Sequence, residues 1–368
     1  MSTTVVRAAR SRFASTSTTT SSASSSNATR RRSRVRSVTR ASTSNSDDDA
    51  SLESAFNASA IALGVPTLGT LAYPTFFVKN GLGLDVATPL FGEKFETIES
   101  VQHFSNAFGT DAFALVALAS LYTLGDAAKN DRLKSETYQR LALSMVLFTG
   151  SFVLAFWGAY ARAEALGDIG PSAAACAALT LAFAPAFATS IGAIREFGPG
   201  HDETWARVGE DFEAAKRLGD RSEKGGYLEL FYKVSFWTSM VVGGSFAFSP
   251  LSPLAIVNET APSSQLIQRA FGLATVFLLA PTQFVLVDAS RRGRLGGGTF
   301  KKLNLSIAAS IALIDWMTVY TFGETAKLNP TLEQMATASG GTYNYVGALA
   351  VSATILACYL YQGVFAKK

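Results

Sequence analysis

The stretch "ETAPSSQLIQRAFG" at residues 259–272 repeats one that comes earlier in the chain, "ETIESVQHFSNAFG" at residues 96–109. Glu, Thr, Gln, Ala, Phe and Gly recur at identical spacing, 163 residues apart. A second pair follows each copy: "DAAKNDRLKSETYQRLALS" at 126–144 aligns with "DASRRGRLGGGTFKKLNLS" at 288–306. Self-similarity at a fixed offset is the mark of a duplicated structural unit. The sequence therefore predicts two tandem repeats.

The apolar residues around these stretches form long runs. Of the 368 residues, 48% are hydrophobic and only 16% are charged, whereas soluble domains carry about 25% charged residues. The runs lack the polar stripe of a water-facing helix. Eight of them are close to the roughly 20 residues that cross a bilayer: 56–78, 104–124, 140–161, 172–194, 227–249, 266–288, 304–323 and 343–364. We expect an all-α, polytopic membrane bundle of about eight transmembrane helices, built from two tandem repeats inserted in parallel orientation.

Basic residues are unequally divided among the loops between these runs. If the helices alternate, one side holds 125–140, 195–226, 289–303 and the C-terminal Lys pair, with four, six, five and two Lys or Arg. The other side holds 79–103, 162–171, 250–265 and 324–342, with two, one, none and one. Loops rich in Lys and Arg stay on the side from which a protein inserts. The split supports an even number of helices, with both mature termini on the same side.

The first 46 residues differ in composition from the rest. They contain nine Arg, many Ser and Thr, and no acid, which is typical of an organelle transit peptide. A disordered basic arm is the alternative. The Ser and Thr content favours a plastid, so we expect a chloroplast membrane, either inner envelope or thylakoid, with stromal termini. The remaining residues carry 23 basic and 28 acidic side chains, which gives no indication of a nucleic-acid partner.

This pattern divides the chain into four parts. We expect a cleaved, disordered transit peptide over 1–46, a first membrane repeat over 55–194, a stromal linker over 195–226 and a second membrane repeat over 227–364. In the linker, apolar side chains recur at helical spacing, which predicts an amphipathic helix on the membrane surface, ended by the Gly pair at 225–226. These apolar side chains are Trp205, Val208, Phe212, Ala215 and Leu218.

Two carboxylates inside the apolar runs are the leading functional candidates. Asp315 lies near the middle of the seventh run and Asp111 about two turns into the second. An acid within a membrane is costly, so it often binds a cation or accepts a proton. A structural role is the alternative, in which Asp315 pairs with a polar neighbour such as Gln283 or Lys233. We include Gln283 among the candidate residues of a substrate or ion pathway.

The polar residues of the repeated stretch have two interpretations. Glu96 and Gln102, with their copies Glu259 and Gln265, could form polar gates at the mouth of a pathway. The Thr that follows each Glu, together with acids in the first turn, is good chemistry for capping a helix, and this is the preferred interpretation. The repeated "AFG" favours close packing of helices, because glycine lets two backbones approach in lipid.

No catalytic or metal-binding motif is present, so enzyme function is disfavoured without being settled. The broken apolar runs, the duplication and the intramembrane acids favour a plastid membrane transporter or channel for a small solute or ion. The alternative is a thylakoid protein that binds pigment or assembles a complex. A pigment could use His103, Gln283 or a carboxylate as ligand, and a carotenoid needs none. The expected partners are the lipid bilayer and a small solute or ion, with a homo-oligomer or a thylakoid complex left open.

Overall fold

The computed structural model describes residues 46–248, 262–328 and 341–366, and within these ranges the chain is helical, without strands. The segment expected to be a transit peptide, apart from Ser46, and the pair Glu259 and Thr260 lie outside the described residues. The helices are α1 (Ser46–Ala72), η1 (Thr75–Lys79), α2 (Asn80–Leu82), η2 (Pro89–Phe91), α3 (Ile98–Lys129), α4 (Glu136–Leu166), α5 (Ala173–Phe197), α6 (His201–Lys216), α7 (Gly226–Phe248), α8 (Pro262–Ala274), η3 (Thr275–Leu279), α9 (Ala280–Arg291), α10 (Gly298–Leu328) and α12 (Gly341–Phe365).

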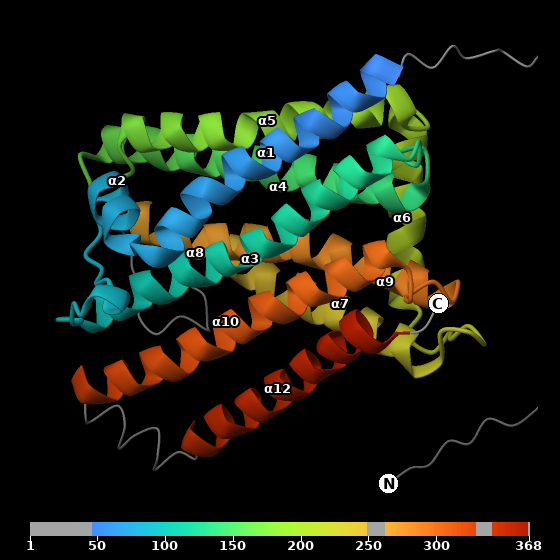
Figure 1. Cartoon of the computed structure of the whole chain (residues 1–368). Coiled ribbons are helices and arrows are strands. Elements are labelled where there is room, and N and C mark those ends of the chain that lie inside the picture. Colours follow the sequence, from blue (N-terminus) through green and yellow to red (C-terminus); the bar gives the residue numbers. More distant parts are fainter. Residues whose placement is uncertain (1–45, 249–261, 329–340, 367–368) are drawn as a thin grey trace, which may run out of the picture. The chain divides into compact units, whose positions relative to one another are not determined.

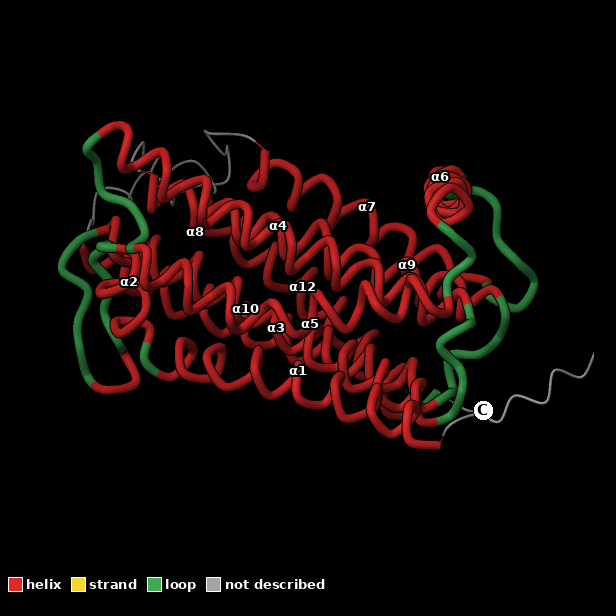
Figure 2. The backbone as a smooth tube through the Cα atoms, turned by 90° about the horizontal axis from the view of Figure 1, so that it is seen from above, coloured by secondary structure: helices red, strands yellow, loops and turns green. Residues whose placement is uncertain are grey.

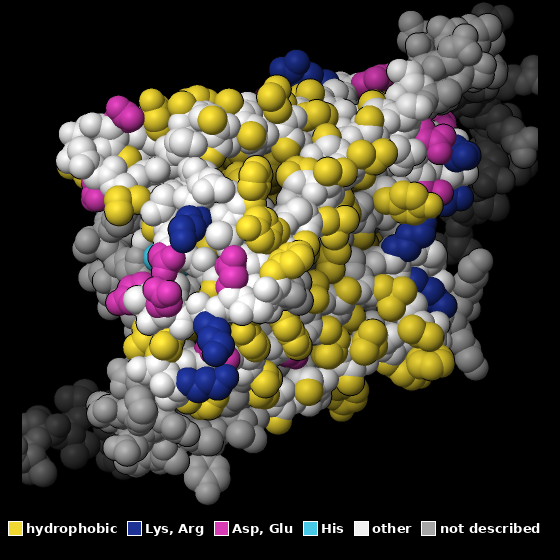
Figure 3. Space-filling model, turned by 60° about the vertical axis from the view of Figure 1, so that its left-hand side comes forward, with side chains coloured by type: hydrophobic (Ala, Val, Ile, Leu, Met, Phe, Trp, Pro, Cys, Tyr) yellow, Lys and Arg dark blue, Asp and Glu magenta, His cyan; other side chains and the backbone are white. Residues whose placement is uncertain are grey.

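Six helices among the described residues are long and apolar enough to cross a membrane. They are Ser51–Ala72, Ile98–Lys129, Glu136–Leu166, Ala173–Phe197, Pro262–Arg291 and Gly298–Leu328. The other two predicted spans also form helices, α7 and α12, and the apolar part of α12 is Leu349–Phe365. Figure 3 shows apolar side chains spread between charged groups at the two ends of the bundle. This distribution is compatible with a multi-pass membrane protein, while the count of eight spans stays a prediction.

The two helices that carry the repeated stretch lie at the centre of the bundle. These helices are α3, which packs against α1, α10 and α8, and α8, which packs against α7, α3 and α4. Helix α3 runs in the same direction as α8–η3–α9, and α4 runs in the same direction as α10 (Figure 1). The turns rich in Lys and Arg gather at one end, where α6 crosses the bundle nearly at right angles to the other helices (Figure 2).

The two copies of the repeated stretch pack against each other. The Nε2 atom of His103 lies 3.1 Å from the Ser264 hydroxyl. A methyl group on Gly109 would come within 2.9 Å of the Phe271 ring, and one on Gly272 within 2.6 Å of the Gly243 carbonyl of α7. Both glycines of the repeated "AFG" therefore stand where helices approach closely, which confirms the packing role predicted for them.

The capping role predicted for the first copy is also confirmed. Thr97 is extended and its side chain accepts a hydrogen bond from the Ser100 backbone N–H, at 3.1 Å, while the Ser100 hydroxyl lies 3.4 Å from the Thr97 backbone nitrogen. This reciprocal arrangement satisfies donors that the first turn of α3 would otherwise leave unpaired.

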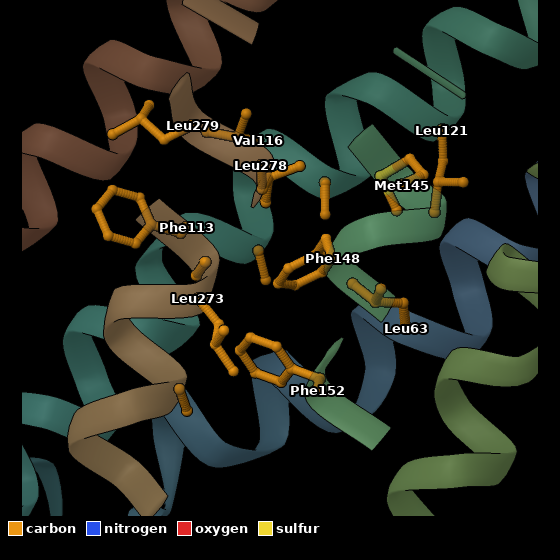
Figure 4. Packing of buried hydrophobic residues seen from close by; sticks show 14 of the residues in the cluster. Leu63, Phe113, Val116, Leu121, Met145, Phe148, Phe152, Leu273, Leu278 and Leu279 are labelled. Carbon is orange, nitrogen blue, oxygen red and sulfur yellow. The ribbon is translucent and has the colours of Figure 1, made fainter. Parts of the chain in front are cut away.

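The core fills the space between α1, α3, α4 and α8–η3. Figure 4 shows Leu63, Phe113, Phe148, Phe152 and Leu273 converging there from these helices. All five side chains are at most 8% exposed. Apolar packing of this kind, rather than one dominant contact, holds the central helices at fixed distances.

Ion pairs dock α6 onto the basic end of the bundle. Arg140 of α4 donates from Nε and Nη2 to the two carboxylate oxygens of Asp211, both at 2.6 Å. Nearby, Arg292 donates to Glu136 at 2.8 Å and lowers the pKa of that carboxyl. Within the predicted linker the chain forms a helix over His201–Lys216, which ends nine residues before the Gly pair at 225–226, and its place on a membrane surface stays a prediction. Leu218 therefore lies beyond the helix, in the turn that leads to α7.

Candidate functional site

A cavity of about 460 Å³ lies beside the break in the first helix. Its walls come from α1, the η1–α2 segment, α3, α4, α5 and α8, so residues as far apart in the chain as Pro66 and Ala270 contribute. Seven aromatic side chains line it: Tyr73, Phe76, Phe77, Phe148, Phe152, Phe156 and Phe183. A cavity of this size accommodates a small organic molecule, for which sites of about 300–1,000 Å³ are usual.

The break in the first helix has a local cause. Pro66 removes one backbone hydrogen bond from α1, and Pro74 follows the end of the helix at Ala72. Proline has no N–H and clashes with the preceding turn, so the chain continues as the short π-helix η1. Non-helical backbone at membrane depth is tolerated where protein or a cavity surrounds it. The interruption thus places Tyr73, Phe76 and Phe77 at the cavity.

The loop after the break is tied back to it by Glu93. The Glu93 carboxylate accepts hydrogen bonds from the Thr88 backbone N–H at 2.7 Å and from the Thr75 hydroxyl at 3.0 Å. The Thr88 bond is the main reason that the pKa of Glu93 is lowered. The Thr75 and Thr88 hydroxyls also contact each other. These bonds fix η1 at the end of the cavity.

Asp111 is the only charged residue among the described residues that line the cavity. The Thr70 hydroxyl lies beside its carboxylate, but Thr70 also lies 3.0 and 3.1 Å from carbonyls of its own helix, so its single proton is shared. The hydroxyls of Thr67 and Thr110 donate to carbonyls of their own helices as well. Asp111 therefore has no basic partner in the cavity. Such a group is stabilised by a proton or by a cation that enters from outside.

Five of the aromatic rings that line the cavity pack in one connected group, those of Phe77, Phe148, Phe152, Phe156 and Phe183. Ring centroids are 4.7 Å apart for Phe148 and Phe152, 5.5 Å for Phe152 and Phe183, and 6.4 Å for Phe77 and Phe156. Aromatic faces attract cations and also pack against flat apolar groups. An aromatic wall with one carboxylate suits a molecule that has an apolar body and one cationic or hydrogen-donating group.

Asp315 is not among the residues that line this cavity. Its carboxylate accepts a hydrogen bond from the Ser352 hydroxyl of α12 at 2.6 Å. The alternative pairing with Lys233 does not form, because the Lys233 ammonium lies 2.9 Å from Glu229 and donates to two backbone carbonyls. The structure therefore gives Asp315 a neutral partner between α10 and α12, and of these two acids only Asp111 lines the 460 Å³ cavity.

The other predicted pathway residues are scattered. Glu96 is exposed just before α3, whereas Gln102 is buried within the first turns of that helix. Gln265 is buried in α8 and accepts a hydrogen bond from Arg162 at 3.0 Å. Gln283 is buried in α9 near the Tyr359 side chain. None of these four lines the cavity around Asp111, so they do not form one site with it.

His103 already uses both ring nitrogens. Its Nδ1 atom lies 2.8 Å from the Asp85 carbonyl, and its Nε2 atom lies 3.1 Å from the Ser264 hydroxyl. The histidine links the start of α3 to the preceding loop and to α8. A pigment metal could bind here only by replacing one of these contacts.

Comparison of the chain with protein-family models, with curated proteins and with solved structures gave no match in any of the three. The functional argument consequently depends on the cavity itself.

Sequence reasoning missed most of the cavity wall. Phe148, Phe152 and Phe156 recur every four residues along α4, which places them on one face of the helix. That spacing was available as a signal, but an aromatic stripe in an apolar helix usually means core packing. Thr70 had no signal, because its proximity to Asp111 depends on how α1 crosses α3.

Proposed function

We propose that this protein is a membrane transporter for a small organic solute that carries a positive charge or a hydrogen-donating group, and that Asp111 recognises that group. The observation that carries the proposal is a carboxylate without a basic partner in an aromatic-walled cavity beside a broken helix. Transporter binding sites are commonly formed where transmembrane helices are interrupted. A solute would leave water by exchanging its hydration shell for Asp111 and the ring faces.

The proposal includes an architecture of two tandem units in parallel orientation, over 55–194 and 227–364, joined by the linker. Two features support this duplication. The turns after α3 and α9 are closed by the same backbone hydrogen bond, from Arg132 N to Ala127 O and from Arg294 N to Ala289 O, each 2.8 Å. Both turns also have a left-handed residue at matching positions, Asp131 and Gly293.

The second supporting feature is a reciprocal pair of contacts between the units. The Arg140 guanidinium lies 5.5 Å from the centre of the Phe284 ring, and the Lys302 ammonium lies 4.4 Å from the centre of the Tyr122 ring. Lys302 follows Arg140 by 162 residues, and Phe284 follows Tyr122 by the same interval. Each unit thus places a cation over an aromatic ring of the other, as expected for two copies related by an axis along the membrane normal.

Uptake into proteoliposomes tests the proposal. Vesicles that contain DNA report the entry of ethidium, a flat aromatic cation, by a rise in fluorescence. We expect the wild-type protein to accelerate entry, Asp111→Asn to reduce it to the rate of protein-free vesicles, and Asp315→Asn, the matched intramembrane acid outside the cavity, to retain at least half. Equal uptake by Asp111→Asn and wild type, or no acceleration by folded wild-type protein, would contradict it.

A second function is favoured by the nearly apolar character of the cavity wall. Such a wall also suits a lipid-soluble molecule held permanently, as in a pigment-binding or assembly protein of a thylakoid. The absorption spectrum of protein purified in mild detergent separates the two. Stoichiometric pigment that is lost in a Phe152→Ala variant would favour the second function over transport. The plastid location, in the inner envelope or thylakoid with stromal termini, belongs to the proposal and is supported by the composition of residues 1–46.

A further inference from the structure

A second cavity, of about 280 Å³, lies between α4 and α8, and it shares no lining residue with the Asp111 cavity. Its polar groups are Arg162, Gln265 and Arg269, and its remaining wall is made of small or aliphatic residues such as Ala155 and Gly158. Both arginines therefore face one space. No carboxylate is among the described residues that line it.

The two guanidinium groups are incompletely paired. Arg162 donates to the Gln265 side chain at 3.0 Å. The Nε–H of Arg269 is buried and has no hydrogen-bond partner. Among the described residues, neither arginine lies within ion-pair distance of an acid. Arg269 stands seven residues after the start of α8, about 10 Å along the helix axis, so its charge lies inside an apolar span. A guanidinium at such depth is costly unless an anion approaches it.

The surroundings favour an anion that arrives from the lipid side. Helix α8 begins at the cavity with Pro262, and the N-terminus of a helix carries a partial positive charge that favours an anion nearby. Leu154, on the rim, is 75% exposed and faces outward from α4. Gly158 has no neighbouring atom within 4 Å of the position of a side chain, so this wall is open. Arg162 stands four residues before the end of α4, near the level expected for headgroups.

We propose that this cavity binds an oxyanion, the phosphate or an equivalent acidic headgroup of an anionic lipid, between Arg162 and Arg269. The two guanidinium groups donate hydrogen bonds to the oxygens of the anion, because the paired N–H donors of arginine match the geometry of phosphate and carboxylate groups. The acyl chains lie along the exposed face of α4 near Leu154. The site is separate from the Asp111 cavity and does not depend on the transport function.

Only the second copy of the repeated stretch has an arginine, Arg269. Arg269 of the second copy corresponds to Asn106 of the first. The proposed site thus belongs to one copy only, and its positive charge is not a general feature of the repeated stretch.

Thermal unfolding in detergent, with lipid added back, tests this site. The probes are phosphatidylglycerol, phosphatidylcholine and inorganic phosphate, each titrated into purified full-length protein. The variants are Arg269→Gln and Arg162→Gln, with Arg195→Gln as the matched control, because Arg195 is exposed on α5 and is not among the residues that line the cavity. Gly158→Leu fills the cavity with both arginines intact and covers the case in which an arginine variant fails to fold.

We expect phosphatidylglycerol to raise the melting temperature of the wild type and of Arg195→Gln by several degrees, and phosphatidylcholine to have little effect. The shift should fall by at least half in Arg269→Gln, Arg162→Gln and Gly158→Leu. If inorganic phosphate alone reproduces the shift with the same dependence on the arginines, the site is an oxyanion site whose ligand is free in solution. A phosphatidylglycerol shift that is absent in the wild type, or equal in Arg269→Gln and Arg195→Gln, would overturn the proposal.

Discussion

The contact between α8 and α7 allows a prediction with a worked magnitude, the substitution Gly272→Ala. A methyl group at this position would lie 2.6 Å from the Gly243 carbonyl oxygen and 2.8 Å from the Ala247 Cα atom. Both are backbone atoms, so neither can rotate away, and the two helices must separate. Overpacking costs about 1–3 kcal/mol, and we take about 3 kcal/mol because the clash is with backbone.

A partial gain offsets this cost. Alanine stabilises a helix by about 1 kcal/mol relative to glycine, which leaves a net loss of about 2 kcal/mol for Gly272→Ala. The matched control is Gly244→Ala on α7, where no atom lies within 4 Å of the added methyl group. The control should be as stable as the wild type or more stable by up to about 1 kcal/mol. Gly109→Ala should lie between the two, because the Phe271 ring that it meets can move.

Unfolding by sodium dodecyl sulfate in mixed micelles, followed by tryptophan fluorescence, measures the three variants on one scale. The order of stability should be Gly244→Ala, then Gly109→Ala, then Gly272→Ala, with the extremes separated by about 3 kcal/mol. If Gly272→Ala unfolds at the same detergent fraction as Gly244→Ala, the close approach of α7 and α8 is wrong. The packing role assigned to the glycine of the second "AFG" would then be wrong as well.

Three further outcomes are expected at the basic end and at the start of α3. Because Arg292 lowers the pKa of Glu136 below the usual 4.5, Glu136 stabilises the fold above that pH and loses this contribution as the pH falls through its lowered pKa. Glu136→Gln should therefore cost up to about 1 kcal/mol at pH 7, and the cost should shrink as the pH is lowered below 4.5 in the same unfolding assay. Arg140→Gln removes both hydrogen bonds to Asp211 and should release α6 from the bundle. Tryptic cleavage in that helix should become at least ten-fold faster, which corresponds to about 1.4 kcal/mol. Unchanged cleavage would show that apolar contacts alone hold α6. His103→Phe should destabilise the protein by about 2 kcal/mol, because the Asp85 carbonyl and the Ser264 hydroxyl each lose a hydrogen-bond partner. If the variant and the wild type melt at the same temperature, His103 does not stabilise the contact between α3, the preceding loop and α8.

The helical architecture was accessible from the sequence because apolar runs of membrane length leave little choice of structure. Seven of the eight predicted runs coincide with a helix or with one unbroken helical segment, including α7 and α12, whereas the first, 56–78, is interrupted between α1 and η1. The repeated "AFG" also predicted a close approach correctly, because glycine in an apolar helix has few other uses. The end of α6 was less accessible: the apolar periodicity extends to Leu218, but the helix stops at Lys216, where the chain turns toward α7.

The candidate site was only partly accessible, and the reason is geometric. The cost of an intramembrane charge singled out both Asp111 and Asp315, and the depth of Asp315 in its run favoured Asp315, which does not line the cavity described above. What separates them is a neighbour: Ser352 for Asp315 and an open aromatic wall for Asp111. Contacts between helices far apart in the chain cannot be read from spacing within either helix. Arg269 was overlooked for the same reason, although an arginine inside an apolar run was a usable signal.

The central claim is that the Asp111 cavity is a binding site for a cationic organic molecule. Equilibrium binding of two organic ions that match in shape and differ in charge tests it most directly. Tetraphenylphosphonium and tetraphenylborate have nearly the same shape and opposite charge. Purified wild-type protein and Asp315→Asn should bind one tetraphenylphosphonium per chain, Asp111→Asn should bind it at least ten-fold more weakly, about 1.4 kcal/mol, and tetraphenylborate should not compete. Equal affinity of Asp111→Asn and wild type for the cation, or equal binding of the two ions, would contradict the account.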